Sequence, residues 1–109
     1  MKMEYIYIAG PYTKDDPITN TANAIKAADI LAEKGYIPFI PHLTMLWHLL
    51  SPHEIDFWYE YDMGWLKKCN ALLRLPGESP GADKEVSMAF ALKMPVYLSV
   101  EDLLEDNEE

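Results

Sequence analysis

Hydrophobic residues follow two different spacings along the chain, and the two spacings alternate. Short runs of β-branched and aromatic residues are typical of strands; they occupy residues 4–9, 36–40, 70–75 and 95–99. Between these runs, apolar residues recur at intervals of three and four, which is typical of helices. Strands that alternate with helices predict a parallel sheet joined by right-handed crossovers.

The first helix is expected after a polar loop that ends at Thr19, because helical spacing of apolar residues begins at Ala24. Gly35 stands where a C-terminal helix cap is expected. The strand after it contains Pro38, which cannot donate to a ladder. This strand is therefore expected at a sheet edge or at a strand end.

Serine residues mark the starts of the later helices. A helix over residues 51–68 is expected because its first four residues, Ser-Pro-His-Glu, are typical of a capping box. Residues 42–50 before it are expected to form a short helix or an irregular aromatic loop. Ser79 and the proline after it predict the cap of a further helix, and Ser99 predicts that of a short terminal helix.

The length of 109 residues suits one domain, expected over residues 1–105, with 106–109 as an acidic tail. In parallel α/β sheets, ligands bind at the carboxyl ends of the strands, where the strand order reverses. In a sheet of four or five strands with the order 2-1-3-4(-5), this point lies between the first and third strands. The loops there span residues 10–13 and 76–81, and both are rich in Gly and Pro. The site is therefore expected at these two loops.

Composition excludes several classes of partner. The chain has 18 acidic and 9 basic residues and a formal net charge of -9. Binding to a polynucleotide or to anionic lipid requires a basic face, so neither is expected. The single cysteine, Cys69, excludes an internal disulfide and a cysteine-based metal cage. No apolar run suits a signal peptide or a membrane helix, so we expect a reduced, cytoplasmic protein, and its small core favours a homo-oligomer.

Two acidic residues are candidates for chemistry. Glu85 lies near the start of the helix after Ser79, where the helix dipole favours the ionised form. Asp62 lies in the helix that leads into the third strand, so it can project toward the expected site. Two carboxylates across a cleft are the minimal equipment for breaking a glycosidic bond. The alternative is that Asp83 and Glu85 are ordinary helix-start acids and that Asp62 belongs to a solvated face.

Other patterns are less specific. His42, His48 and His53 lack the spacing of four residues that a zinc-binding helix uses, so surface or loop histidines and no metal site are expected. The aromatic residues between 47 and 65 are expected in a core or a subunit interface, or as rings that stack on a planar ligand. The loop before Glu85 lacks the glycine patterns of nucleotide-binding fingerprints, although its position at a helix start suits an anion.

Three segments resemble the signature segments of the nucleoside 2-deoxyribosyltransferase superfamily, which includes the 2'-deoxynucleoside 5'-phosphate N-hydrolases. They are residues 5–12 (YIYIAGPY), 61–70 (YDMGWLKKCN) and 79–89 (SPGADKEVSMA). The resemblance implies a flavodoxin-like three-layer α/β sandwich. It also implies cleavage of the N-glycosidic bond of a (deoxy)nucleoside or its 5'-monophosphate, by hydrolysis or by base exchange, with no cofactor and with a small molecule as the partner.

By the same resemblance, Glu85 takes the place of the nucleophilic glutamate, and Asp62 that of the aspartate that helps with proton transfer. Tyr7 matches a tyrosine that holds the glutamate in position. Ser79 resembles the serine that contacts the 5'-phosphate in the hydrolases. The other candidates for substrate binding are Gly10, Pro11, Tyr12, Gly81 and His42.

The chain also departs from the family pattern. Asn70 stands where the family often has a second aspartate, and Lys14 stands near the place of a phosphate-binding arginine. The segment 41–51, expected to cover the nucleobase, does not match the family closely. A second class of function stays open, in which the same fold binds a nucleotide without turning it over and Glu85 only bonds ribose hydroxyls. Release of free base distinguishes the two.

Overall fold

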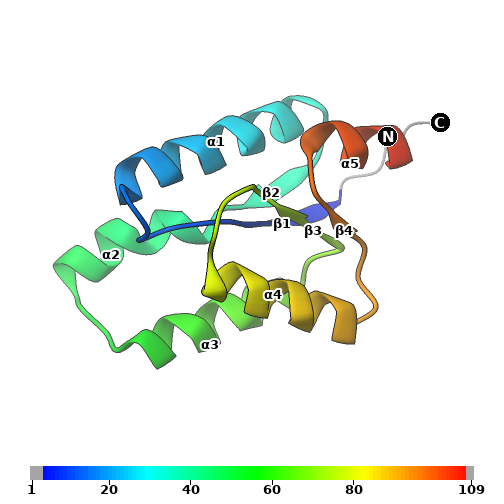
Figure 1. The fold of residues 1–109 in the computed structure, drawn as a ribbon. Helices are drawn as coiled ribbons and strands as arrows, with labels where there is room; N and C mark the ends of the chain where they lie inside the picture. Colours follow the sequence, from blue (N-terminus) through cyan, green and yellow to red (C-terminus); the bar gives the residue numbers. More distant parts are fainter. Residues whose placement is uncertain (1–3, 108–109) are drawn as a thin grey trace.

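The computed structural model describes residues 4–107, which form a parallel sheet between two layers of helices (Figure 1). The sheet has four strands in the order β2-β1-β3-β4. They are β1 (Tyr5–Ala9), β2 (Ile37–Phe39), β3 (Ala71–Arg74) and β4 (Val96–Tyr97). The predicted strand order is therefore confirmed, as is the edge position of the strand that contains Pro38.

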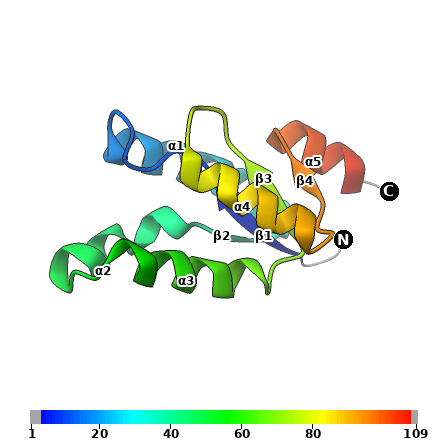
Figure 2. The ribbon, with the colours of Figure 1, turned by 60° about the horizontal axis from the view of Figure 1, so that its bottom comes forward.

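Two pairs of helices cover the sheet. α1 (Pro17–Glu33) and α5 (Val100–Asn107) lie on one face, and α3 (Ile55–Leu66) and α4 (Pro80–Ala91) lie on the other (Figure 2). The short helices η1 (Pro41–Leu43) and α2 (Thr44–Leu50) connect β2 to α3. α5 includes Asp106 and Asn107, the first two residues of the expected acidic tail; Glu108 and Glu109 lie outside the described residues.

β1 is one of the two inner strands, and its side chains point alternately into the two halves of the core. Ile6 and Ile8 are fully buried toward α1 and α5, where each contributes about 1.5–3 kcal/mol by leaving water. Tyr7 and Ala9 are fully buried on the opposite side, in the cluster that includes residues of α3 and α4. The strand's period of two therefore places the Tyr7 hydroxyl on the α3 and α4 side of the sheet.

Two predicted helix starts are wrong. α1 begins at Pro17, before the expected end of the polar loop, because the Asp16 side chain accepts a hydrogen bond from the Ile18 N–H and caps it. α3 begins at Ile55 instead of within the expected capping box. The Glu54 side chain makes no capping bond there.

Aromatic contacts explain the late start of α3. The Nδ1 atom of His48 accepts hydrogen bonds from the His53 backbone N–H at 3.3 Å and from the Trp58 indole at 2.7 Å. Trp47 packs edge-to-face against Trp58 and Tyr61. These contacts hold residues 51–54 in a non-helical connection.

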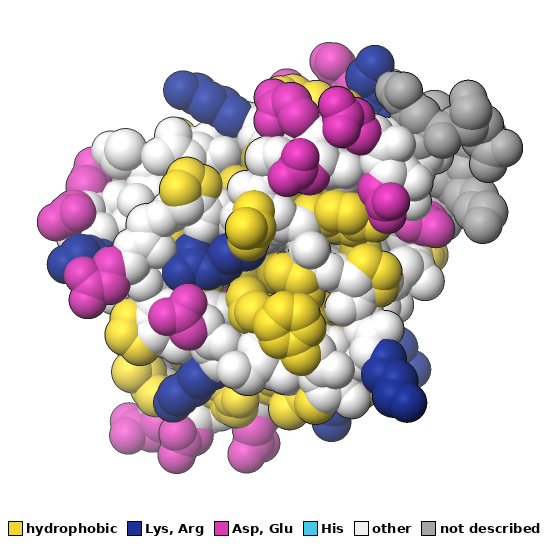
Figure 3. Space-filling model, turned by 45° about the vertical axis from the view of Figure 1, so that its right-hand side comes forward, with side chains coloured by type: hydrophobic (Ala, Val, Ile, Leu, Met, Phe, Trp, Pro, Cys, Tyr) yellow, Lys and Arg dark blue, Asp and Glu magenta, His cyan; other side chains and the backbone are white. Residues whose placement is uncertain are grey.

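Serine caps occur where the sequence predicts them in the second half of the chain. The Ser79 hydroxyl accepts a hydrogen bond from the Ala82 N–H at 3.1 Å, and Ser99 accepts one from the Asp102 N–H at 3.0 Å. Acidic side chains gather at the end of the molecule where α5 lies (Figure 3). Within residues 4–107, no helix has the length and apolar character that a membrane crossing requires.

Candidate active site

The loops after β1 and β3 lie against each other, as the predicted reversal of strand order requires. The Leu75 N–H donates to the Ala9 carbonyl at 2.7 Å, which extends the pairing of the two strands into their loops. Gly77 has a φ of 116°, and a Cβ atom there would lie 2.7 Å from Pro11 Cγ. Only glycine suits this close, left-handed turn, so the sequence fixes the contact between the loops.

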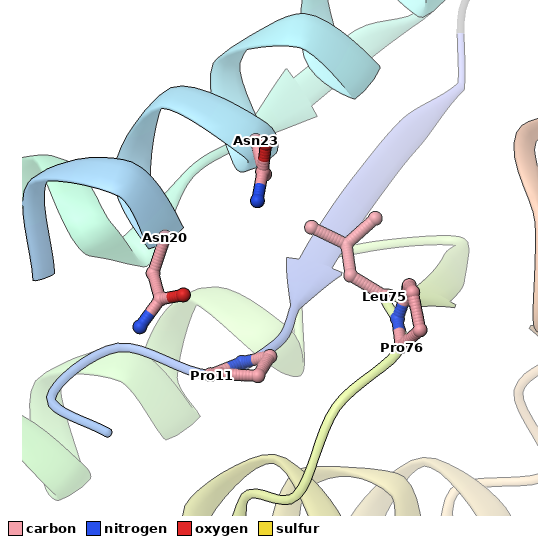
Figure 4. A pocket seen from close by; sticks show the side chains of 5 residues that line it. All are labelled: Pro11, Asn20, Asn23, Leu75 and Pro76. Atoms are coloured by element: carbon pink, nitrogen blue, oxygen red, sulfur yellow. The ribbon is translucent and has the colours of Figure 1, made fainter. Parts of the chain in front are cut away.

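A small cavity of about 120 Å³ lies between these loops and α1. Pro11, Leu75 and Pro76 line one side of it, and Asn20 and Asn23 approach from α1 (Figure 4). This cavity lies on the α1 side of the sheet, whereas the candidate carboxylates belong to α3 and α4. It is therefore a separate feature from the site that the carboxylates form.

Glu85 lies on α4 with its side chain partly buried against β1. The fully buried Tyr7 donates a hydrogen bond from its hydroxyl to Glu85 Oε2 at 2.6 Å. Burial raises the pKa of Glu85 to about 7, against the opposing effects of the Tyr7 bond and of the Arg74 charge. Burial and the adjacent Glu85 carboxylate raise the pKa of Tyr7, so the hydroxyl stays protonated and remains a donor.

Asp62 on α3 supplies the second carboxyl group. Its Oδ1 atom is buried and has no hydrogen-bond partner among the described residues. Burial, and then the negative charge of Glu85, raise the pKa of Asp62 to about 7. Because Glu85 has a donor and a nearby cation while Asp62 has neither, the shared negative charge resides on Glu85 near neutral pH. Asp62 then carries the proton.

Arg74, the last residue of β3, is a site residue that the sequence patterns do not indicate. Its guanidinium donates to the carbonyls of Leu75 and Gly77 and, at 3.0 Å, to Asp83 Oδ1. Its charge favours the ionised form of Glu85. The sequence feature that could have indicated Arg74 is its place at the end of a buried strand, directly before a Gly- and Pro-rich loop.

His42 is buried, contrary to the expectation of a surface or loop histidine. Its Nε2 atom lies 2.9 Å from the Pro11 carbonyl oxygen, and its ring packs edge-on against Tyr12. Burial lowers the pKa of His42, so the ring is neutral and Nε2 donates the hydrogen bond. His42 thereby ties η1 to the loop after β1.

Ser79 and Gly81 lie at the N-terminus of α4, where the Ser79 hydroxyl is occupied as the helix cap. Gly81 has open space around its Cα. Lys14 in the loop after β1 pairs with Glu78 in the loop after β3, at 3.4 Å. Among residues 4–107, no cluster of three or more His, Cys, Asp or Glu side chains is arranged to hold a metal ion.

Residues 4–99 match the model of a protein family described as a domain of unknown function, DUF7768. The chain belongs to this family. No curated protein matches this chain.

Solved structures of two 2-deoxyribosyltransferases share the fold of this DUF7768 domain. The enzyme of the psychrotolerant bacterium Bacillus psychrosaccharolyticus superposes with a TM-score of 0.62 and 19% identity, over 84% of this chain and 69% of that one. The enzyme of Leishmania mexicana gives a TM-score of 0.64 and 20% identity, over 85% of this chain and 61% of that one. The chain thus spans less than two thirds of the Leishmania enzyme. These likenesses confirm the flavodoxin-like α/β fold.

The structure brings most of the expected residues to one end of the sheet. Tyr7, Asp62 and Glu85 lie together on the α3 and α4 side. Asn70 is excluded from this group, because it lies before β3, where its side chain accepts a hydrogen bond from the Tyr5 N–H at 2.8 Å. That bond joins the starts of two strands, at the opposite end from the loops. Asn70 therefore stabilises the sheet.

Proposed function

We propose that this protein cleaves the N-glycosidic bond of a (deoxy)nucleoside or nucleoside 5'-monophosphate, with Glu85 as the nucleophile. One observation carries the proposal: a partly buried glutamate is held by a buried tyrosine, next to a second carboxyl group whose buried Oδ1 atom has no hydrogen-bond partner among residues 4–107. Two carboxyl groups with different preferences for the proton can serve as nucleophile and acid in the same reaction. The fold shared with two 2-deoxyribosyltransferases supports the same class of substrate.

Glu85 acts first. Tyr7 binds Oε2 and leaves Oε1 free to attack C1' of the sugar. As the new C1'–O bond forms, the C1'–N bond breaks and its electron pair moves to the nitrogen of the departing base. The product is a glycosyl-enzyme ester on Glu85 and a base that needs a proton.

Asp62 acts as the proton donor to that base, since its raised pKa keeps the proton in place near neutral pH. The resulting carboxylate then accepts a proton from water as the water attacks C1'. The C1'–Oε1 bond breaks, its electron pair returns to Glu85 as the carboxylate, and the sugar is released. If a second base takes the place of water, the same two steps run in reverse and exchange the base. Both routes use only side chains of this chain and require no cofactor.

Of the two routes, we propose hydrolysis, with a nucleoside 5'-monophosphate as the substrate. Ser79 and the first turn of α4 lie six residues or fewer before Glu85, where a helix N-terminus favours an anion. The Ala82 and Asp83 N–H groups donate to Ser79, which leaves the Gly81 N–H for an anion. Gly81 leaves open space beside this turn. Gly10, Pro11, Tyr12 and His42 are proposed to form the wall opposite the sugar and the base.

Release of free base tests the proposal. Wild-type protein is incubated with a panel of ribo- and deoxyribonucleosides and their 5'-monophosphates, and the bases are separated by chromatography. Base release that Glu85→Gln abolishes, and that the exposed-site control Glu60→Gln keeps, is the expected result. Tight binding of a nucleotide with no release over hours would contradict catalysis and favour a binding module. Base exchange that exceeds hydrolysis when free base is added would contradict the hydrolase branch.

A further inference from the structure

Arg74 joins three parts of the candidate site through one guanidinium group. Its side chain is only 13% exposed, unlike the 71% exposed carboxylate of its partner Asp83. The Leu75 and Gly77 carbonyls that it binds belong to the loop after β3, and Asp83 belongs to the first turn of α4. The cation therefore fixes the path of the chain between β3 and the turn that leads to Glu85.

The charge of Arg74 has a second consequence. Three elements place titratable groups near Glu85: Tyr7 on β1, Asp62 on α3 and Arg74 on β3. Cys69, directly before β3, affects the ionisation of Tyr7. Arg74 is the cation among them. In a chain with a net charge of -9, this cation favours the carboxylate form of Glu85 while burial opposes it.

We propose that Arg74 is a positioning residue: its guanidinium holds the loop after β3 and the first turn of α4 in place, and its charge, held near Glu85 by these contacts, favours the carboxylate form of Glu85. This inference rests on the function proposed above. Arg74 reaches the reaction through the loop and through Glu85, and it takes no part in bond making.

The two contributions are separable because arginine and lysine differ in shape. Arg74→Lys keeps the positive charge but supplies a single point charge that cannot reproduce the guanidinium fork across three acceptors. Arg74→Met retains an unbranched apolar stem and loses both the positive charge and the hydrogen-bond donors. Lys26→Met on the exposed face of α1 is the matched control, since it removes one positive charge from the chain without touching the site.

Two measurements test the proposal. The first is kcat/KM for base release as a function of pH. The second is the titration of the Glu85 side-chain carboxyl by carbon-13 NMR, assigned with Glu85→Gln, which needs no turnover. Thermal unfolding of every variant reports whether it folds. If the wild type releases no base, the proposed function fails, and the NMR titration still decides whether Arg74 governs the ionisation of Glu85.

For Arg74→Met, we expect the Glu85 titration and the acid limb of kcat/KM to move to higher pH. At pH 6, kcat/KM is expected to fall about 10- to 100-fold, because the variant loses both the favourable charge near Glu85 and the hydrogen bonds that hold the loop and the first turn of α4. Arg74→Lys is expected to keep the wild-type titration and to lower kcat/KM equally at every pH. Lys26→Met is expected to change neither.

The proposal is wrong if Arg74→Met lowers the unfolding temperature and the rate but leaves both the acid limb and the Glu85 titration in place. That pattern would make Arg74 a structural residue only. Should Arg74→Met fail to fold, Arg74→Lys decides: wild-type kcat/KM at every pH would exclude a role for the three guanidinium contacts.

Discussion

The Tyr7 hydroxyl on β1 lies 2.6 Å from Glu85 Oε2 on α4 and donates a hydrogen bond to it, across 78 positions of sequence. Tyr7 is fully buried, and its ring packs against Phe39 with 5.6 Å between the centroids. The donor therefore cannot move away without disturbing the core. Because this bond fixes one oxygen of the Glu85 carboxylate, the orientation of the other oxygen is fixed as well.

Tyr7→Phe is expected to keep the fold and to weaken the reaction. The ring contacts with Phe39 persist, whereas the bond that favours the Glu85 carboxylate is lost, so the pKa of Glu85 rises further. We expect kcat/KM at pH 6 to fall about 10-fold or more, in line with a hydrogen bond to a charged group, and the acid limb to move to higher pH. The measurement is the pH dependence of base release.

Tyr97→Phe is the matched control for this substitution. The Tyr97 hydroxyl also donates to a carboxylate, that of Asp106, but on the opposite side of the sheet. Its removal is expected to leave the pH profile unchanged. An acid limb that stays in place in Tyr7→Phe as well would show that the hydrogen bond does not govern Glu85.

Asp62→Asn is expected to lower the rate of base release by about 10²–10⁴, which is the usual loss when general acid–base catalysis is removed. Asn lacks a transferable proton, so substrates with poor leaving groups suffer most and those with good leaving groups suffer least. Rates are compared across a series of nucleotides whose bases differ in acidity. Glu60→Gln, on the exposed face of the same helix, is the control. Equal losses across the series would indicate that Asp62 positions the sugar and transfers no proton.

Much of this arrangement follows from local patterns in the sequence. Gly- and Pro-rich loops after two neighbouring parallel strands locate the site, and the serine at position 79 predicts the start of α4. The spacing of Ser79 and Glu85 within one helix brings the carboxylate back toward β1. These features depend on residues close together in the chain, which is why spacing is informative.

Other features arise from contacts between distant segments, and spacing does not reveal them. The predicted capping box before α3 fails because His48 and Trp58 pull His53 into an aromatic cluster. His42 is buried because η1 meets the loop after β1. Arg74 gains its role from backbone carbonyls that face it only after the loop folds.

The stability of the folded protein should decrease as the pH rises from about 4 to 7. Burial raises the pKa values of Asp62 and Glu85 to about 7, above the ordinary range near 4. Between these values the folded state binds more protons than the unfolded state, so each step toward higher pH favours unfolding. This loss of folding stability is absent below the pKa of these carboxyl groups in the unfolded state and complete above their pKa in the folded state.

Asp62→Asn should remove part of this loss, because the amide stays neutral at every pH. We expect the variant to unfold at a higher temperature than the wild type at pH 8 and at a similar temperature at pH 4. In a domain of this size, each 1 kcal/mol shifts the midpoint by about 4–8 °C. Thermal unfolding followed by circular dichroism at the two pH values provides the test. If the difference in unfolding temperature between the variant and the wild type were the same at pH 4 and pH 8, it would contradict the raised pKa of Asp62.

Ser79→Ala tests whether the substrate carries a 5'-phosphate that binds at the N-terminus of α4. If a 5'-phosphate lies at the N-terminus of α4, monophosphates should be better substrates than nucleosides, and the preference should decrease in this variant. The expected decrease is modest, because the Gly81 N–H remains and the substitution releases the Ala82 N–H from its bond to the Ser79 hydroxyl. Lys14 can add its charge if it exchanges its ion pair with Glu78 for the phosphate.

The substitution also removes a helix cap worth about 1 kcal/mol, so its effect on folding has to be separated from its effect on binding. Ser99→Ala is the matched control, since Ser99 caps α5 in the same way and lies outside the site. Both variants should lose similar stability by thermal unfolding, whereas only Ser79→Ala should change the ratio of kcat/KM for a monophosphate to that for its nucleoside. High salt should weaken the preference for the monophosphate in the wild type, because screening acts on the charged ligand alone. A preference for nucleosides that Ser79→Ala leaves unaltered would exclude a phosphate at this helix, and the substrate would then be an unphosphorylated nucleoside.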